Sequence, residues 1–84
     1  MHAWEAIDGV LDFMEEHLRE EMNTEALAQS AGLSPFYFQR LFKRLTGRPV
    51  LEYVKMRRLA LAASALEDRE KRILDIAVDY GFLI

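Results

Sequence analysis

A row of side chains suited to contacting nucleic acid lies in the middle of the chain. If residues 34–46 are helical, an aromatic ring, an amide and two cations fall on one face at i, i+3, i+4 and i+7 spacing: Phe36, Gln39, Arg40 and Lys43. Amide and guanidinium groups can read base edges, and cations can hold phosphates. We therefore expect residues 34–46 to form a recognition helix that enters the major groove of double-stranded DNA.

The residues around this row favour a helix at the same place. Ser34 is a good N-cap residue, and Pro35 suits the first helical position, where its missing N–H needs no partner. Gly47 predicts a left-handed end to the helix. An opposite face carries apolar side chains at helical spacing and is expected to face a core: Phe38, Leu41, Phe42 and Leu45.

Each polar member of the row also has a structural interpretation. Arg40 could pair with an acid such as Glu25, because charged helix faces are often only solvated, and the same holds for Gln39. A single exposed Phe36 is ordinary for a protein surface. Tyr37 could lie on either side of the helix.

Composition points to one small domain. The chain has 84 residues, no cysteine, and no apolar run near the roughly 20 residues that span a bilayer. The first residues lack the basic and apolar regions of a signal peptide. These features favour a soluble domain, with the reducing cytoplasm as the default location.

The net charge of −3 conceals an uneven distribution. Residues 1–25 carry eight acids against one base, for a net of −7. Residues 26–58 carry seven bases against one acid, for +6, and residues 59–84 have a net of −2. A basic middle between acidic ends suits a polyanionic ligand despite the negative total.

Helical periodicity predicts an all-α fold, a small helical bundle. The expected helices cover residues 3–18, 24–31, 35–46, 50–67 and 73–80. Trp4, Ile7, Leu11, Met14 and Leu18 mark the apolar stripe of the first. Asn23 is the expected cap of the second, and the glycine-containing turn between the second and third is typical of a helix-turn-helix.

Neighbouring arginines in the fourth expected helix require different roles. Arg57 and Arg58 point about 100° apart on a helix, so one is expected to stay inward in a structural ion pair with carboxylates of the first or last helix. His17 lies near the end of the first helix, where a cation is favoured. We find no set of residues spaced as a metal site, a cofactor site or a catalytic centre, and expect no enzyme.

An internal repeat links two parts of the chain. Residues 27–33 and 76–82 share an aliphatic–Ala pair followed by Gly and an apolar residue, at an offset of 49. The second copy ends before any segment equivalent to residues 34–46. We expect the chain to be a fragment of a longer regulator.

At this point the chain resembles the DNA-binding region of the AraC/XylS family of transcription regulators. The resemblance covers essentially all of its length. It is carried by Leu27-Ala28, Ala31-Gly32-Leu33-Ser34-Pro35, Phe38-Gln39-Arg40-Leu41-Phe42-Lys43, Gly47, Tyr53, Arg57-Arg58-Leu59, Ala62, Leu66, Ile73, Ile76-Ala77 and Gly81-Phe82. The family has two helix-turn-helix units joined by a long helix, so the resemblance implies a first unit over 1–47, a linker helix over 48–68 and a truncated second unit over 69–84.

The resemblance also implies which residues contact DNA. Phe36, Gln39 and Arg40 correspond to base-contacting positions of the family. Lys43 and Arg44 lie a turn further on, where phosphate is the expected partner. Arg48 and Lys55 are weaker phosphate candidates.

The resemblance extends to partners outside this segment. It implies double-stranded DNA and RNA polymerase as partners, and by analogy a small-molecule effector bound by a separate domain. The alternative is a protein interaction or dimerisation module, in which the acidic first helix and the apolar residues Phe82, Leu83 and Ile84 bind a partner or a second copy.

Overall fold

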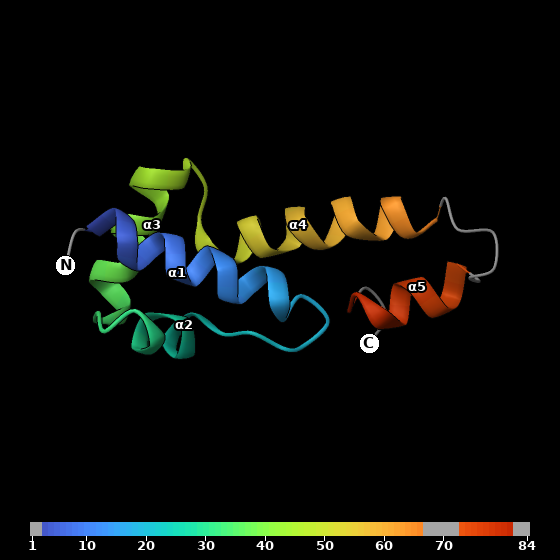
Figure 1. Cartoon of the computed structure of the whole chain (residues 1–84), viewed down its shortest axis with the longest axis horizontal. Coiled ribbons are helices and arrows are strands. Elements are labelled where there is room, and N and C mark those ends of the chain that lie inside the picture. The colour runs from blue at the N-terminus through green and yellow to red at the C-terminus, as the bar shows by residue number, and fades with distance from the viewer. Residues whose placement is uncertain (1–2, 67–72, 82–84) are drawn as a thin grey trace.

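The chain folds into helices joined by short turns. The computed structural model describes residues 3–66 and 73–81, and these ranges contain five α-helices and no strand, which confirms the expected all-α fold. They are α1 (Ala3–Glu16), α2 (Thr24–Ser30), α3 (Pro35–Thr46), α4 (Val50–Ala65) and α5 (Ile73–Asp79), as Figure 1 shows. No helix in these ranges has both the length and the apolar character needed to cross a membrane.

The predicted caps form. Asn23 Oδ1 accepts a hydrogen bond from the Ala26 amide at 2.7 Å, and Ser34 Oγ accepts one from the Tyr37 amide at 3.2 Å. Gly47 adopts a φ of 82°, and its amide donates to the Lys43 carbonyl at 2.8 Å. These contacts start α2 and α3 at the expected residues and end α3 as glycine predicts.

Several expected helix ends are wrong by one or two residues. Helix α1 ends at Glu16 rather than Leu18, because the chain tightens into turns in which the His17 amide donates to Met14 and the Glu20 amide to His17. Helices α2 and α5 end at Ser30 and Asp79, one residue before the expected positions. Helix α4 ends at Ala65, and its expected last residue, 67, lies outside the described residues.

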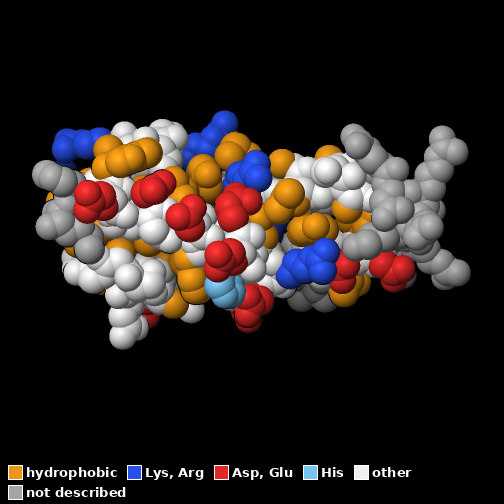
Figure 2. Space-filling view, viewed as in Figure 1, with side chains coloured by type: hydrophobic (Ala, Val, Ile, Leu, Met, Phe, Trp, Pro, Cys, Tyr) orange, Lys and Arg blue, Asp and Glu red, His pale blue; other side chains and the backbone are white. Residues whose placement is uncertain are grey.

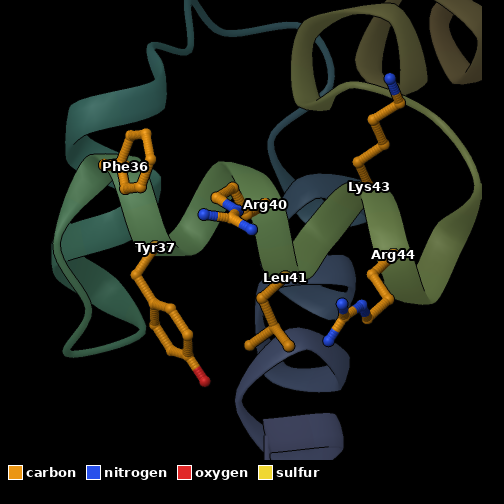
Figure 3. Close-up of a pocket in the computed structure, with 6 residues that line it drawn as sticks. All are labelled: Phe36, Tyr37, Arg40, Leu41, Lys43 and Arg44. Carbon is orange, nitrogen blue, oxygen red and sulfur yellow. The ribbon is translucent and has the colours of Figure 1, made fainter.

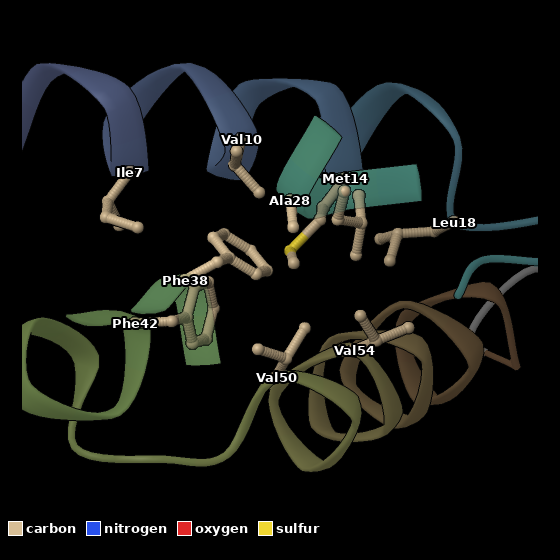
Figure 4. Close-up of a cluster of buried hydrophobic side chains, with 10 residues drawn as sticks. Ile7, Val10, Met14, Leu18, Ala28, Phe38, Phe42, Val50 and Val54 are labelled. Atoms are coloured by element: carbon tan, nitrogen blue, oxygen red, sulfur yellow. The ribbon is translucent and has the colours of Figure 1, made fainter. Parts of the chain in front are cut away.

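The main core lies where α1 to α4 meet. Its buried members are Ile7, Val10, Met14, Leu18, Leu27, Ala28, Phe38, Phe42, Val50 and Val54. Figure 4 shows the α1 side chains pointing toward Phe38 and Phe42, with Val50 and Val54 closing the cluster from α4. The Phe42 ring meets Phe38 at 5.8 Å and Tyr53 edge-on at 5.4 Å between centroids. Helix α3 is thus held in the core by two aromatic side chains.

Four predicted core positions are wrong or only partly right. Leu45 is 36% exposed and Trp4 is 52% exposed, whereas Leu11 and Leu41 are partly buried. Leu45 lies in the last turn of α3 and Trp4 in the first turn of α1. The periodic stripe continues to the helix ends, but the neighbouring helix no longer covers it there.

Helix α5 lies apart from the main core. It packs on the far half of α4 through a second buried cluster of Ala62, Ile76 and Tyr80. The molecule measures 44 × 21 × 18 Å, and its radius of gyration is 14.1 Å. A compact chain of this length has a radius of about 12 Å. Figure 1 shows the cause: α4 runs away from the three-helix unit α1–α3, with α5 beside its far end.

The internal repeat is confirmed in the backbone up to Gly81. Helices α2 and α5 both begin and end at the offset of 49. At the end of α2, the Ala31 amide donates to Leu27 at 3.2 Å and the Gly32 amide to Gln29 at 3.0 Å. At the end of α5, the equivalent amides donate to Ile76 at 3.1 Å and Val78 at 3.2 Å. Gly32 and Gly81 have φ of 71° and 76°. Residues 82–84, the end of the second copy, lie outside the described residues.

Candidate nucleic-acid interface

Helix α3 has a buried face and an exposed face, as predicted, and the exposed face carries the row of Phe36, Gln39, Arg40 and Lys43. Phe38 and Phe42 are fully buried, while Phe36 is 70% exposed. Gln39, Arg40 and Lys43 are exposed as well. The cap at Ser34 and the stop at Gly47 fix the length of the helix, and the two buried rings fix its rotation. The row therefore has one defined direction, away from the core.

Within the row, Arg40 contacts an aromatic ring. The Arg40 guanidinium carbon lies 5.5 Å from the centroid of the Phe36 ring. Among the described residues, the ion pairs do not include one between Arg40 and Glu25, the structural alternative. The ring and the guanidinium thus present a planar polar group and an apolar face side by side to solvent.

Tyr37 lies on the side of α3 that Leu41 and Arg44 also occupy. Figure 3 shows Tyr37, Leu41 and Arg44 pointing to one side of the helix, next to the row that contains Phe36 and Arg40. These side chains and Lys43 line one open hollow. Because every lining residue belongs to α3, this hollow is an outer surface of the helix rather than an enclosed ligand cavity.

The predicted phosphate-binding cations are unequally placed. Lys43 and Arg44 belong to the last turn of α3, and Arg48 lies in the turn to α4. Thr46 shapes this turn, because its hydroxyl donates to the Phe42 carbonyl at 2.8 Å and accepts from the Arg48 amide at 3.3 Å. Lys55 lies on α4 and lines neither hollow beside α3.

These cations are available to a ligand. Within residues 3–66 and 73–81, no ion pair engages Lys43, Arg44, Arg48 or Lys55. A smaller hollow joins the row to the start of α4, and it is lined by Gln39, Arg40, Lys43, Pro49 and Val50. The structure therefore places the row on α3 and the turn before α4 next to each other.

Negative charge gathers on another helix. Figure 2 shows acidic side chains along α1 on the face toward the viewer. The exposed acids of α1 are Glu5, Asp8, Asp12, Glu15 and Glu16.

At the end of this helix His17 stacks on Phe13 at 4.0 Å between ring centroids, and its Nδ1 donates to the Phe13 carbonyl at 2.8 Å. His17 is thus a local structural residue.

Arg57 holds the expected structural ion pair. Its Nε and Nη2 donate to the two carboxylate oxygens of Glu15 at 2.6 and 3.2 Å. The hydrogen bond and charge of Glu15 raise the pKa of the Arg57 guanidinium further above its ordinary value. This pair ties the middle of α4 to α1.

Sequence reasoning missed the partners of Arg58. Its Nε donates to the Leu18 carbonyl at 2.8 Å and its Nη2 to the Glu20 carbonyl at 2.5 Å. Both acceptors are backbone groups of the turn after α1, so no acidic side chain marks them in the sequence. The only signal was the pair of adjacent arginines, which required two different roles.

Comparison with known proteins gives consistent matches. Residues 27–83 match the family of helix-turn-helix domains. The regulatory protein SoxS of Salmonella typhimurium is 35% identical over 83 residues, which cover 99% of this chain and 78% of SoxS. The probable transcription factor PqrA of Proteus vulgaris is 37% identical over 82 residues, 95% of this chain and 67% of PqrA. The uncharacterized HTH-type transcriptional regulator YbfP of Bacillus subtilis is 37% identical over 82 residues, 98% of this chain but 28% of YbfP.

Proposed function

Since the chain belongs to the AraC-type family of helix-turn-helix transcription regulators, a family that binds DNA in a sequence-specific manner, we propose that α3 is its recognition helix. In this proposal α3 lies in the major groove of double-stranded DNA. The observation that carries it is the exposed row of Phe36, Gln39, Arg40 and Lys43 on a helix whose rotation is fixed by buried Phe38 and Phe42.

The dimensions of α3 support this placement. A helix with its side chains is about 10–12 Å wide, close to the roughly 12 Å width of the major groove. Helix α3 has 12 residues, or about 18 Å of length at 1.5 Å per residue. Figure 1 shows it at one end of the elongated molecule, beside α1 and away from α5.

Each side chain of the row has a role that its chemistry suits. Gln39 pairs bidentately with adenine and Arg40 with guanine, and Phe36 packs on a thymine methyl group. To do so, Arg40 leaves the Phe36 ring, or slides along it, when a base edge replaces the solvent. These three contacts come from the first two turns of α3, the part of a recognition helix that reaches base edges.

The phosphate contacts follow from position and charge. Lys43 and Arg44 end α3, and Arg48 follows in the turn to α4, so all three lie where the helix leaves the groove. Lys55 adds a fourth cation from α4. The acidic face of α1 is repelled by DNA, which disfavours docking through that face. We also propose contact with RNA polymerase, a partner that membership of the AraC-type family implies.

Salt dependence of duplex binding tests the proposal. Cations that neutralise phosphates release counterions, so affinity must fall steeply between 50 and 200 mM salt. The measurement is a fluorescence anisotropy titration of a labelled duplex at several salt concentrations. An affinity that does not change with salt would exclude the phosphate contacts proposed for α3 and the turn after it.

A further inference from the structure

Helix α5 is held by a small apolar contact. Its buried cluster consists of Ala62, Ile76 and Tyr80, with Leu61 and Ala65 partly buried beside it. Two of these residues are alanines, which bury little surface. By contrast, the main core contains two phenylalanines and a set of larger aliphatic side chains. The apolar contact alone therefore leaves the direction of α5 weakly specified.

The turn after α1 contacts the end of α5 through an arginine side chain. Arg19, in the turn after α1, lies over the Tyr80 ring at 5.3 Å from the centroid. The neighbouring Tyr80 side chain raises the pKa of the Arg19 guanidinium. Both residues line one open cleft together with Leu18, Glu20 and Leu61. The turn after α1 is thus the part of the three-helix unit that faces α5.

Arg58 binds the turn after α1 and also lies beside the end of α5. From α4, its Nε and Nη2 hold the Leu18 and Glu20 carbonyls of the turn. Its remaining terminal nitrogen, Nη1, lies close to the turn that follows α5, since a Cβ built on Gly81 would be 3.7 Å from it. The planar guanidinium has donors on several edges, so one group can order the turn after α1 while it lies beside Gly81 at the end of α5. Lysine, with one compact charge, cannot do both in the same geometry.

We infer that Arg58 is the positioning residue that sets α5 in a defined direction relative to the three-helix unit α1–α3. Arg57 is the natural comparison. It lies next to Arg58 on α4 and also binds α1, but its partner is Glu15 and it has no contact with α5 among the described residues. Arg57 braces α4 against α1, whereas Arg58 links α1, α4 and α5.

The link has a consequence for DNA binding that rests on the proposed function. Because α5 repeats α2 in register, it is the supporting helix of the second motif, as α2 is for α3. The direction of α5 relative to α3 therefore sets how the two motifs face one duplex. Arg58 acts on this geometry without touching DNA.

Amide hydrogen exchange in the free protein tests this inference, with equivalent amides as an internal control. The amides of Tyr80 and Gly81 report on the end of α5, and those of Ala31 and Gly32 report on the same positions of α2. In Arg58→Met we expect protection of the α5 amides to fall tenfold or more while the α2 amides stay unchanged. In Arg57→Met we expect the ratio of amide protection in α5 to amide protection in α2 to stay unchanged. Arg58→Lys, a milder variant, should show the same selective loss to a smaller degree.

Either of two results would overturn the inference. Unchanged α5 protection in Arg58→Met would show that the apolar cluster and the Arg19–Tyr80 contact position the helix without Arg58. An equal loss in α2 and α5, in both Arg58→Met and Arg58→Lys, would give Arg58 a general stabilising role. Duplex binding by the unchanged protein is measured in parallel, so a failure of α3 to bind DNA is seen separately.

Discussion

Removing one cation from the end of α3 should change the salt dependence of DNA binding by a predictable amount. Four of the cations that have no ion pair among the described residues are the proposed phosphate contacts: Lys43, Arg44, Arg48 and Lys55. If each neutralises one phosphate, the slope of log K against log salt is about −0.9 per contact, or about −3.6 in total. Affinity then falls about 150-fold between 50 and 200 mM salt.

The substitution Lys43→Met keeps the length of the side chain and removes its charge. With one contact fewer, the slope becomes about −2.7, and the same rise in salt lowers affinity only about 40-fold. The fold should be unaffected, because Lys43 is exposed and has no ion pair among residues 3–66 and 73–81. Anisotropy titrations at four or more salt concentrations give both slopes.

Lys43→Arg is the matched control. It retains the charge and should therefore retain the slope of the unchanged protein. The reasoning is refuted if Lys43→Met and Lys43→Arg share one slope, or if Lys43→Met weakens one duplex sequence much more than another. The first result removes Lys43 from the phosphate contacts, and the second makes it a base-reading residue.

Two further pairs of substitutions test the fold that orients α3. Phe42→Ala empties a fully buried site and should cost about 3–5 kcal/mol in urea denaturation, whereas Phe36→Ala, 70% exposed on the same helix, should change stability by less than about 0.5 kcal/mol. Equal losses would contradict the assigned rotation of α3. Gly9→Ala, on an exposed face of α1 with nothing within 4 Å, should stabilise by about 0.5–1 kcal/mol. Gly47→Ala, at a φ of 82°, should destabilise by about 1 kcal/mol, and a gain there would rule out the left-handed helix end.

The local sequence was sufficient to predict α3. Its cap, its first-turn proline and its terminal glycine are separate signals within one segment, and the 3.6-residue period separates buried Phe38 and Phe42 from exposed Phe36. The same signals gave the α2 cap at Asn23. Comparison of residues 27–33 with residues 76–82 identified the repeat, and α2 and α5 are both followed by a glycine with positive φ.

Long-range contacts were the part that the sequence did not reveal. The helical period places Leu45 and Trp4 on the apolar faces of their helices, yet both side chains are exposed. The packing angle of the neighbouring helices decides how far along each helix the apolar face is buried. Arg58 binds backbone carbonyls 38 and 40 residues away, and any residue type can supply a carbonyl. Ion pairs such as Arg57–Glu15 are easier to anticipate because both partners have charged side chains that can be identified in the sequence.

The central claim is that α3 reads bases through Gln39 and Arg40, and the most direct test is the ratio of affinities for two duplexes. One duplex is selected from a randomised library by the unchanged protein, and the other is its scrambled version. Two bidentate contacts worth at least about 1 kcal/mol each predict a ratio of about 30 or more, which falls in Gln39→Ala and again in Arg40→Ala. Equal affinities for the two duplexes, or a ratio that both variants leave unchanged, would contradict the claim.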